Sequence, residues 1–518
     1  MKKQILKNLI SNYLASFIAM ALGFLVIPFL IRKLGKEAFG VIVLAEALIA
    51  FSQVFTVSVR IALSRYATFS LSQGKTDEFA EYLSTGRVLL FFSTALVLAL
   101  GFFVSFYFPS FFRVPAGFAW QSRILFALVT LAFAISIPNI VFWSVLYAKE
   151  RFDLINFSSS VGVILRALCI FIFFSALSAA YANLVAYGFI YLAMTWGQNL
   201  MVYFFQRKIM PGLKITLKRF RPEKIKEILS YTGHTSLGNL SGILCEDAIN
   251  IGINLFLGPA FNAVYSVALK FPTMMRRLFE EPSWALTPTF TVMAAKNEKK
   301  KIETLFFMYS KAMTILATPL AMVLIIFSKR IILAWVGNEF LLAAEIMAVY
   351  ASATFLMIPF SVCGCITNAY GKVKIPSRVN LAVGLGHIVL SAFLVLRFKL
   401  GLLGIAASSL VFAVLSSAFF SPFYSCRVSE MSFWRYWRES FLKPFLLGVF
   451  LIVIDFLAVK TLFLETKWMA VPSVVFVSAC FYYVVAYRFC LNFEERRHVG
   501  DIVSSFVIAR KKISAEIL

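Results

Sequence analysis

Long apolar runs separated by short polar segments make up most of this sequence. Each run holds about 20 mainly apolar residues, the length that a helix needs to cross a bilayer. About fourteen such runs divide the chain, from residues 9–31 near its start to residues 468–487 near its end. The pattern predicts an all-α, polytopic membrane bundle of about 14 transmembrane helices.

The composition excludes several other classes of protein. Hydrophobic residues make up 60% of the 518 residues and charged residues only 14%, whereas soluble domains are about 25% charged. The mean hydropathy of +0.84 describes the whole length and not a single segment. A soluble enzyme, a disordered scaffold and a protein with one membrane anchor are therefore excluded.

The charge is strongly basic, with 50 Lys and Arg against 25 Asp and Glu. Most of these basic residues lie in alternate loops and in both terminal tails, as expected for cytoplasmic segments of a membrane protein. We therefore expect both termini in the cytoplasm. Because topology explains the basic excess, we expect no nucleic-acid partner.

One long polar segment divides the chain. Residues 206–232 are rich in Lys and Arg and contain two prolines, which indicates a basic cytoplasmic linker lying on anionic lipid headgroups. The linker separates an N-lobe of six spans (1–205) from a C-lobe of six spans (233–424). Two further spans follow (425–490), and the chain ends in a cytoplasmic amphipathic tail (491–518).

The two lobes show an internal repeat. Leu34-Gly35, followed by Val41 and Ala45, recurs in register as Leu257-Gly258, followed by Val264 and Ala268. Each set is placed at the outer turn between the first two spans of a lobe. Parallel repeats of this kind are typical of secondary transporters, which bind their substrate near the midplane between the lobes.

Several short motifs resemble a known family. The resemblance is carried by Arg32-Lys33-Leu34-Gly35-Lys36-Glu37-Ala38-Phe39-Gly40, by residues 60–66 (RIALSRY), by Trp335-Val336-Gly337-Asn338 and by Ala369-Tyr370-Gly371-Lys372. These stretches are similar to bacterial polysaccharide flippases of the multidrug/oligosaccharidyl-lipid/polysaccharide exporter superfamily. The resemblance implies a MATE-like fold in a bacterial inner membrane, which moves lipid-linked oligosaccharide between leaflets.

Nothing in the sequence indicates an enzyme or a cofactor. No phosphate-binding loop, zinc-binding helix motif or serine nucleophile elbow is present. The seven Cys mostly lie in apolar runs and read as small buried side chains. We expect a monomeric secondary-type transporter that works without a cofactor. The candidate coupling ions are H⁺ and Na⁺, and the candidate protein partner is glycan assembly machinery.

Basic residues inside the spans are the candidate substrate-binding groups. A cation in a bilayer is costly, so it should face a cavity or a partner, and Arg and Lys both bind phosphate oxygens. The alternatives are ion pairs that hold helices together and, for residues near the inner ends of spans, side chains that extend to the headgroups. The candidates for a cationic cavity are Arg166, Lys270, Lys311, Arg277, Arg87 and Arg60.

Three carboxylates within the spans are candidates for ion coupling: Asp247, Glu246 and Glu46. A carboxylate in the membrane can carry a proton or bind sodium, and it can equally be the counter-ion of a buried cation. The sequence leaves these roles open.

The favoured function is a flippase that translocates polyprenyl-diphosphate-linked oligosaccharide from the cytoplasmic to the outer leaflet for surface polysaccharide biosynthesis. The alternatives are an ion-coupled antiporter for drugs or organic cations and a flippase for the peptidoglycan precursor. A drug antiporter would favour an acidic chamber, whereas Arg166 near the midplane favours an anionic substrate. A membrane glycosyltransferase would need an acidic motif in a large loop, and no loop is that large.

Overall fold

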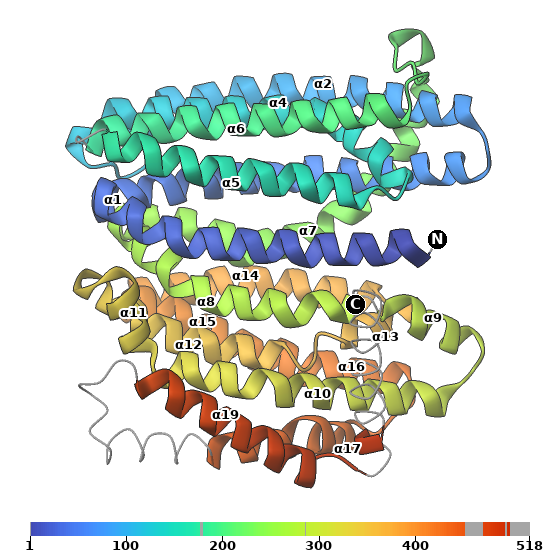
Figure 1. Cartoon of the computed structure of the whole chain (residues 1–518), viewed down its shortest axis with the longest axis vertical. Coiled ribbons are helices and arrows are strands. Elements are labelled where there is room, and N and C mark those ends of the chain that lie inside the picture. Colours follow the sequence, from blue (N-terminus) through green and yellow to red (C-terminus); the bar gives the residue numbers. More distant parts are fainter. Residues whose placement is uncertain (1, 177–179, 285, 451–469, 493–494, 498–518) are drawn as a thin grey trace, which may run out of the picture. The chain divides into compact units, whose positions relative to one another are not determined.

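The computed structural model describes residues 2–176, 180–284, 286–450, 470–492 and 495–497. These residues form helices joined by short turns, with no strand among them, so the expected all-α class is confirmed (Figure 1). Residues 451–469, which include most of the thirteenth expected span (441–463), and the tail from residue 498 onward lie outside the described residues.

The first half of the chain contains long helices and short connecting turns. In order they are α1 (Lys2–Ser72), α2 (Thr76–Phe106), α3 (Phe108–Phe111), η1 (Ala116–Phe118), α4 (Ala119–Ala148), α5 (Phe152–Ala176), α6 (Ala180–Ile209), η2 (Leu217–Arg219) and α7 (Pro222–Phe256).

The second half continues with further helices, two of which (η4 and η5) are π-helical. They are α8 (Pro259–Trp284), α9 (Thr287–Ala295), α10 (Lys299–Ile326), α11 (Ser328–Val336), η3 (Asn338–Phe340), α12 (Leu341–Met357), α13 (Cys363–Ala369), α14 (Lys374–Leu396), α15 (Gly401–Phe412), η4 (Ala413–Phe420), α16 (Ser421–Val428), α17 (Phe433–Trp437), η5 (Arg438–Leu442) and α19 (Ala470–Phe489).

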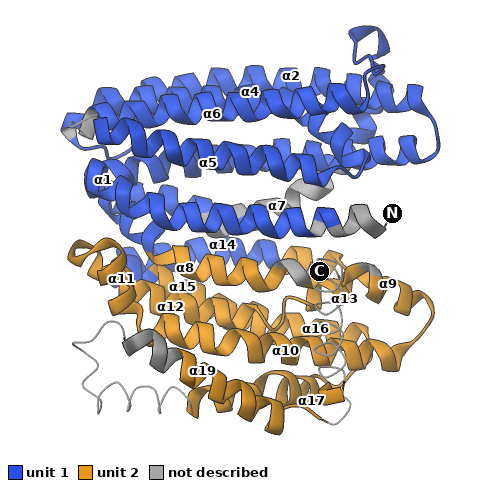
Figure 2. Cartoon of the chain, in the orientation of Figure 1, with its two compact units in different colours: residues 1–267, 380–404 blue, residues 268–379, 405–518 orange. Residues whose placement is uncertain are grey.

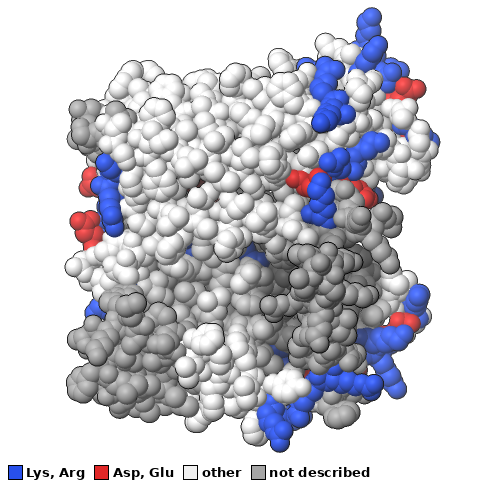
Figure 3. Space-filling model, viewed as in Figure 1, with Lys and Arg blue, Asp and Glu red and all other residues white. Residues whose placement is uncertain are grey.

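The helices have the length and composition of a multi-pass membrane protein. Eight helical segments of the described residues are apolar and long enough to cross a bilayer. In a helix every backbone hydrogen bond is made within the segment, which is the condition for crossing hydrocarbon. In the face that Figure 3 shows, Lys and Arg gather where the helices end, and the surfaces between those ends are largely uncharged.

The first expected turn is confirmed, and two later helix boundaries differ from the sequence expectation. The first two expected spans are the two arms of α1, which breaks at Gly35 with φ +78° and reverses its direction there (Figure 1). The end of the expected linker, from Pro222 onward, is helical and continues into the next span, so both belong to α7. The expected span at residues 341–366 is divided between α12 and α13 around Pro359, because proline removes a backbone donor.

The described chain forms two compact units, residues 1–267 with 380–404 and residues 268–379 with 405–518 (Figure 2). In the first unit, α4 packs on α6 and α2, and α1 packs on α4, α5 and α7. In the second, α10 packs on α12, and the stacked rings of Phe306 and Tyr436 lie in its core with centroids 4.3 Å apart. The division into lobes at residues 205 and 233 stays a prediction.

The internal repeat is also seen in the backbone conformation of the turns. Gly35 and Gly258 both have positive φ, +78° and +101°, a conformation that glycine adopts without strain. A second pair, Gly74 and Asn297, has the same separation in the sequence as Gly35 and Gly258. Both residues of this second pair also have positive φ, +75° and +54°. In both of these turns the N–H of the next residue donates to the carbonyl five positions back, which is a Schellman helix end. The parallel repeat that the sequence predicts is therefore present in the local structure.

Candidate functional site

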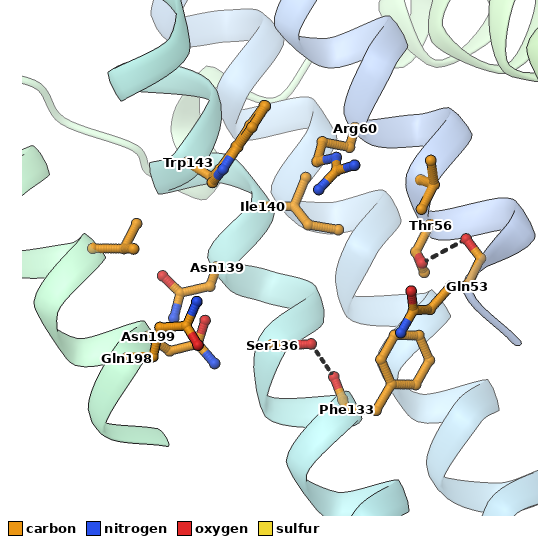
Figure 4. Close-up of a pocket in the computed structure, with 12 residues that line it drawn as sticks. Gln53, Thr56, Arg60, Phe133, Ser136, Asn139, Ile140, Trp143, Gln198 and Asn199 are labelled. Atoms are coloured by element: carbon orange, nitrogen blue, oxygen red, sulfur yellow. Dashed lines mark hydrogen bonds between the residues drawn. The ribbon is translucent and has the colours of Figure 1, made fainter. Parts of the chain in front are cut away.

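A polar cavity lies within the first unit, between α1, α4 and α6. Its volume is about 200 Å³. Figure 4 shows α4 carrying Asn139 and Trp143, with Gln198 and Asn199 of α6 on one side and Arg60 and Gln53 of α1 on the other. The polar and aromatic residues that line it are Gln53, Thr56, Arg60, Ser136, Asn139, Trp143, Gln198 and Asn199.

Arg60 is the only charged residue among those lining this cavity. Its guanidinium carbon lies over the indole ring of Trp143, 4.8 Å from the ring centroid. A cation held against an aromatic face is fixed in place without being neutralised by an acid. Arg60 therefore lies in the lining with an aromatic face beside it, and its binding of an anionic ligand stays a prediction.

A second hollow of about 510 Å³ lies along the next turns of α1, lined by Arg65, Tyr66, Ser72 and Tyr147 among others. Tyr147 of α4 stacks on Trp143, with ring centroids 5.2 Å apart. Trp143 lines the first hollow and Tyr147 the second, so the two hollows lie next to each other along α4.

Arg166 of α5 faces α6 and not an acidic partner. Its guanidinium carbon lies 4.3 Å from the ring centroid of Tyr191, and Nη2 donates a long hydrogen bond of 3.5 Å to the hydroxyl of Thr195. The Nε atom of Arg166 is buried and donates to no described group. Thr195 also accepts, through its carbonyl, a hydrogen bond of 2.9 Å from Asn199. Thr195 therefore connects Arg166 with the lining of the polar cavity.

Glu46 of α1 belongs to the same region of the unit. The hydroxyl of Tyr187 donates to Glu46 Oε1 at 2.7 Å, and Tyr187 lies next to Tyr191 with ring centroids 6.3 Å apart. Glu46 and Arg166 thus approach the same pair of tyrosines from two helices. This cluster contains one of the three predicted coupling carboxylates and the predicted midplane cation.

Lys311 has a structural partner. Its Nζ atom lies 2.8 Å from Oε1 of Glu495, and only 5% of Lys311 and 6% of Glu495 are exposed. The two helix segments that carry them are thereby joined by a buried ion pair. Of the two roles that the sequence left open for Lys311, this contact favours the structural one.

Arg87 likewise holds the chain together. Its Nη1 donates to the carbonyl of Ile215 in the linker at 3.2 Å. Three basic residues of the linker also form ion pairs with the start of α2: Arg219–Asp77 at 2.9 Å, Arg221–Glu81 at 3.1 Å, and Lys224 with Glu78 and Glu81 at 3.4 and 3.6 Å. Several of the linker's basic residues are therefore paired with acids of the protein, although the sequence analysis expected them to lie on lipid headgroups.

None of the other predicted residues with a described side chain is among those that line the two cavities above. Lys270 and Asp247 are half-buried and each interacts with a neighbouring group. Arg277 is exposed on α8, and its neighbour Arg276 pairs with Glu280 at 3.7 Å, as the spacing of the two predicts. The side chain of Glu246 lies outside the described residues. The roles of these residues remain predictions.

The sequence analysis did not identify the uncharged polar residues of the cavity. Gln53, Asn139, Gln198 and Asn199 line it beside Arg60. Amide side chains are uncommon in apolar spans because their hydrogen bonds must be made inside the protein. Amide residues within the apolar runs therefore indicate a polar site, even where no charged residue does.

Within the described residues, no three His, Cys, Asp or Glu side chains cluster as a metal site would require. The lining of the polar cavity offers a cation, amides, hydroxyls and aromatic faces, which are groups that can bind a polar anionic ligand.

Comparison with known proteins identifies the family. A family model described as "Polysaccharide biosynthesis protein" matches residues 29–345. Among curated relatives, the membrane protein EpsK of Bacillus subtilis is 23% identical over 95% of this chain and 96% of its own. A putative O-antigen transporter of Shigella flexneri is 22% identical over 82% and 99%. A probable low-salt glycan biosynthesis flippase, Agl15 of Haloferax volcanii, is 21% identical over 81% and 84%.

Solved structures share the fold. An inward-facing multidrug resistance transporter of the MATE family matches with a TM-score of 0.63 at 14% identity, covering 81% of this chain and 96% of its own. The lipid II flippase MurJ in an inward closed conformation matches with a TM-score of 0.61 at 16% identity, covering 93% and 98%. The fold is MATE-like, and the chain belongs to the polysaccharide biosynthesis protein family.

Proposed function

We propose that this protein is a flippase that moves a polyprenyl-diphosphate-linked oligosaccharide from the cytoplasmic to the outer leaflet for surface polysaccharide biosynthesis. The observation that carries the proposal is the cavity of the first unit, in which Arg60 is the one charge among amides and hydroxyls. A cation suits the diphosphate, and neutral polar groups suit the sugars. The names of the relatives, an O-antigen transporter and a glycan biosynthesis flippase, support the same substrate class.

The proposed orientation places this cavity toward the cytoplasm. The positive-inside rule assigns both termini and the basic linker to the cytoplasmic side of a bacterial inner membrane. Arg60, Trp143 and Asn199 then lie in the inner parts of their spans. A lipid-linked glycan that has been assembled on the cytoplasmic face would meet Arg65 and Tyr147 first and Arg60 next.

The proposed mechanism is alternating access by a secondary-type transporter acting as a monomer without a cofactor. Glu46 is the best-supported coupling residue, because Tyr187 donates to it and Arg166 lies at the neighbouring tyrosine. Through Thr195 and Asn199 this cluster touches the cavity lining. Binding of H⁺ or Na⁺ at Glu46 would therefore alter the hydrogen bonds next to the substrate.

The cavity argues against an antiporter for organic cations. Among the described residues that line it, Arg60 is charged and none is an acid. A cationic drug placed there would lie against a like charge in a medium of low dielectric, which is unfavourable. Export of the peptidoglycan precursor remains compatible with this chemistry, since that lipid also bears a diphosphate and sugars.

Depletion of the protein in its native host tests the proposal. We expect lipid-linked oligosaccharide to accumulate with its sugars on the cytoplasmic side, where an added glycosidase in inside-out vesicles would cleave them. Surface polysaccharide should fall at the same time. Normal surface polysaccharide combined with increased drug sensitivity would instead favour the antiporter, and arrest of peptidoglycan synthesis would favour the precursor flippase.

A further inference from the structure

We propose that the cavity between α1, α4 and α6 is a subsite for one uncharged sugar ring, the ring next to the diphosphate, and that it discriminates glycans by their hydroxyl groups. The inference rests on the proposed function and adds to it the part of the substrate that this cavity recognises. Arg60 holds the phosphate at the edge of the subsite, and the amides of α4 and α6 bind the sugar.

Two hydroxyls of the lining favour a sugar over a phosphate. The hydroxyls of Thr56 and Ser136 donate to the carbonyls of Gln53 and Phe133 on their own helices, at 3.1 and 2.6 Å (Figure 4). Their oxygens can then only accept toward the cavity. An ionised phosphate has no hydrogen to give them, whereas a sugar hydroxyl donates and accepts.

The amides of the lining also offer acceptors to a ligand that donates. Asn139 Oδ1 is buried and accepts no hydrogen bond within the described structure. A buried acceptor without a donor costs about 1–3 kcal/mol, so a ligand that supplies one is favoured. Asn199 uses one of its N–H groups on Thr195 at 2.9 Å and keeps its carbonyl oxygen available. Hydroxyl donors of a bound sugar would supply hydrogen bonds to these two carbonyl oxygens.

The size of the cavity limits the occupant. At about 200 Å³ it is smaller than the roughly 300–1,000 Å³ of pockets that enclose drug-sized ligands. It has room for a single ring and not for a complete oligosaccharide. The remaining sugars would lie outside it, so the subsite recognises one ring and does not restrict the rest of the glycan.

Gln198 provides an independent means of perturbing the subsite. It faces Gly162 of α5, where an added Cβ would lie 3.1 Å from Gln198 Oε1. A contact this short forces the amide to shift by a few tenths of an ångström. Gly162→Ala therefore displaces Gln198 from outside the cavity without altering any residue that lines it.

The experiment measures equilibrium binding of radiolabelled lipids to the full-length protein in nanodiscs. The probes are undecaprenyl diphosphate alone and the same lipid carrying one N-acetylglucosamine, one glucose or one galactose. We expect the wild-type protein to bind at least one sugar-bearing lipid about tenfold more tightly than the bare lipid. The variant Asn139→Leu/Gln198→Met, which keeps side-chain size, should bind all four lipids alike, and Gly162→Ala should lose part of the difference.

The controls separate the subsite from the proposed function. Gln121→Leu, on α4 but outside the cavity, should keep the sugar preference, and Arg60→Gln should weaken binding of all four lipids. If the wild type binds the bare and sugar-bearing lipids equally, or if Asn139→Leu/Gln198→Met keeps the preference, the sugar subsite is refuted while the flippase proposal stands. If the wild type binds none of the lipids, the flippase proposal itself fails.

Discussion

Lys311 on α10 and Glu495 beyond α19 form a bidentate ion pair, with the Nζ atom 2.8 and 2.9 Å from the two carboxylate oxygens. The backbone N–H of Asn492 also donates to Glu495 Oε2, at 2.8 Å. The carboxylate is therefore satisfied by two kinds of donor in a buried position. This contact attaches the segment after the last described helix to the interior of the second unit.

Removing one partner of this pair should destabilise the protein. Lys311→Met leaves the buried carboxylate of Glu495 without its cation, which typically costs about 3–5 kcal/mol. The double variant Lys311→Met/Glu495→Met should recover much of that loss and should still transport. Chemical unfolding in detergent measures the free energies, and Lys301→Met, which breaks an exposed pair on the same helix, should change stability by less than about 1 kcal/mol. Equal effects of Lys311→Met and Lys301→Met would contradict the buried pair.

Arg60 should be required for transport. Arg60→Gln removes the one charge in the cavity lining and its contact with Trp143, and a charged hydrogen bond contributes about 1.5–3 kcal/mol. We expect the initial rate of flipping in proteoliposomes to fall about 10- to 100-fold, and Arg60→Lys to fall between this variant and the wild type. Arg207→Gln, an exposed change at the end of α6, is the matched control. A wild-type rate for Arg60→Gln would remove Arg60 from the site.

Glu46 should link transport to an ion gradient. Glu46→Gln keeps an oxygen that accepts from the Tyr187 hydroxyl but cannot carry a proton or a full negative charge. We expect this variant to equilibrate lipid-linked substrate between leaflets at a rate that no longer responds to an imposed pH or sodium gradient. Glu37→Gln, exposed on the same helix, should leave that response intact. If Glu46→Gln responds to gradients as the wild type does, coupling lies elsewhere.

Gly40 should not tolerate a side chain. A Cβ at this position would lie 1.8 Å from the carbonyl oxygen of Pro259, so the backbone of α1 or of α8 would have to move. Overpacking of this kind costs about 1–3 kcal/mol or more, and we expect Gly40→Ala to lower the thermal midpoint and the folded yield. Gly197→Ala on α6 meets nothing within 4 Å and should be neutral or slightly stabilising. Similar melting of the two variants would show that the contact is not rigid.

The architecture follows from the sequence because its physical determinants are local. Apolar runs predict membrane helices, and the repeated Leu-Gly pairs predict equivalent turns, which the positive φ values of Gly35 and Gly258 confirm. The fusion of the end of the linker with a span in α7 was not predictable in the same way. A linker rich in charge is compatible with a separate helix or with a continuous one, and Arg221 and Lys224 find their acidic partners only in the folded unit.

The roles of interior charges were harder to predict because the partners are distant in the sequence. Lys311 pairs with a residue of the C-terminal tail, Arg87 with a backbone carbonyl, and Arg60 with an aromatic face. A sequence identifies a costly charge but not the group that stabilises it. The amides of the cavity were even harder to predict, because each one alone resembles an ordinary helix-packing residue.

The contact between Arg60 and Trp143 also gives the protein an optical signal. Indole emission depends on a cation lying against the ring, so a ligand that draws Arg60 away from Trp143 alters the fluorescence of this one residue. Replacing the other seven of the 8 tryptophans with phenylalanine would isolate that signal. Occupancy of the cavity could then be followed in real time, in a lipid bilayer and without any attached dye.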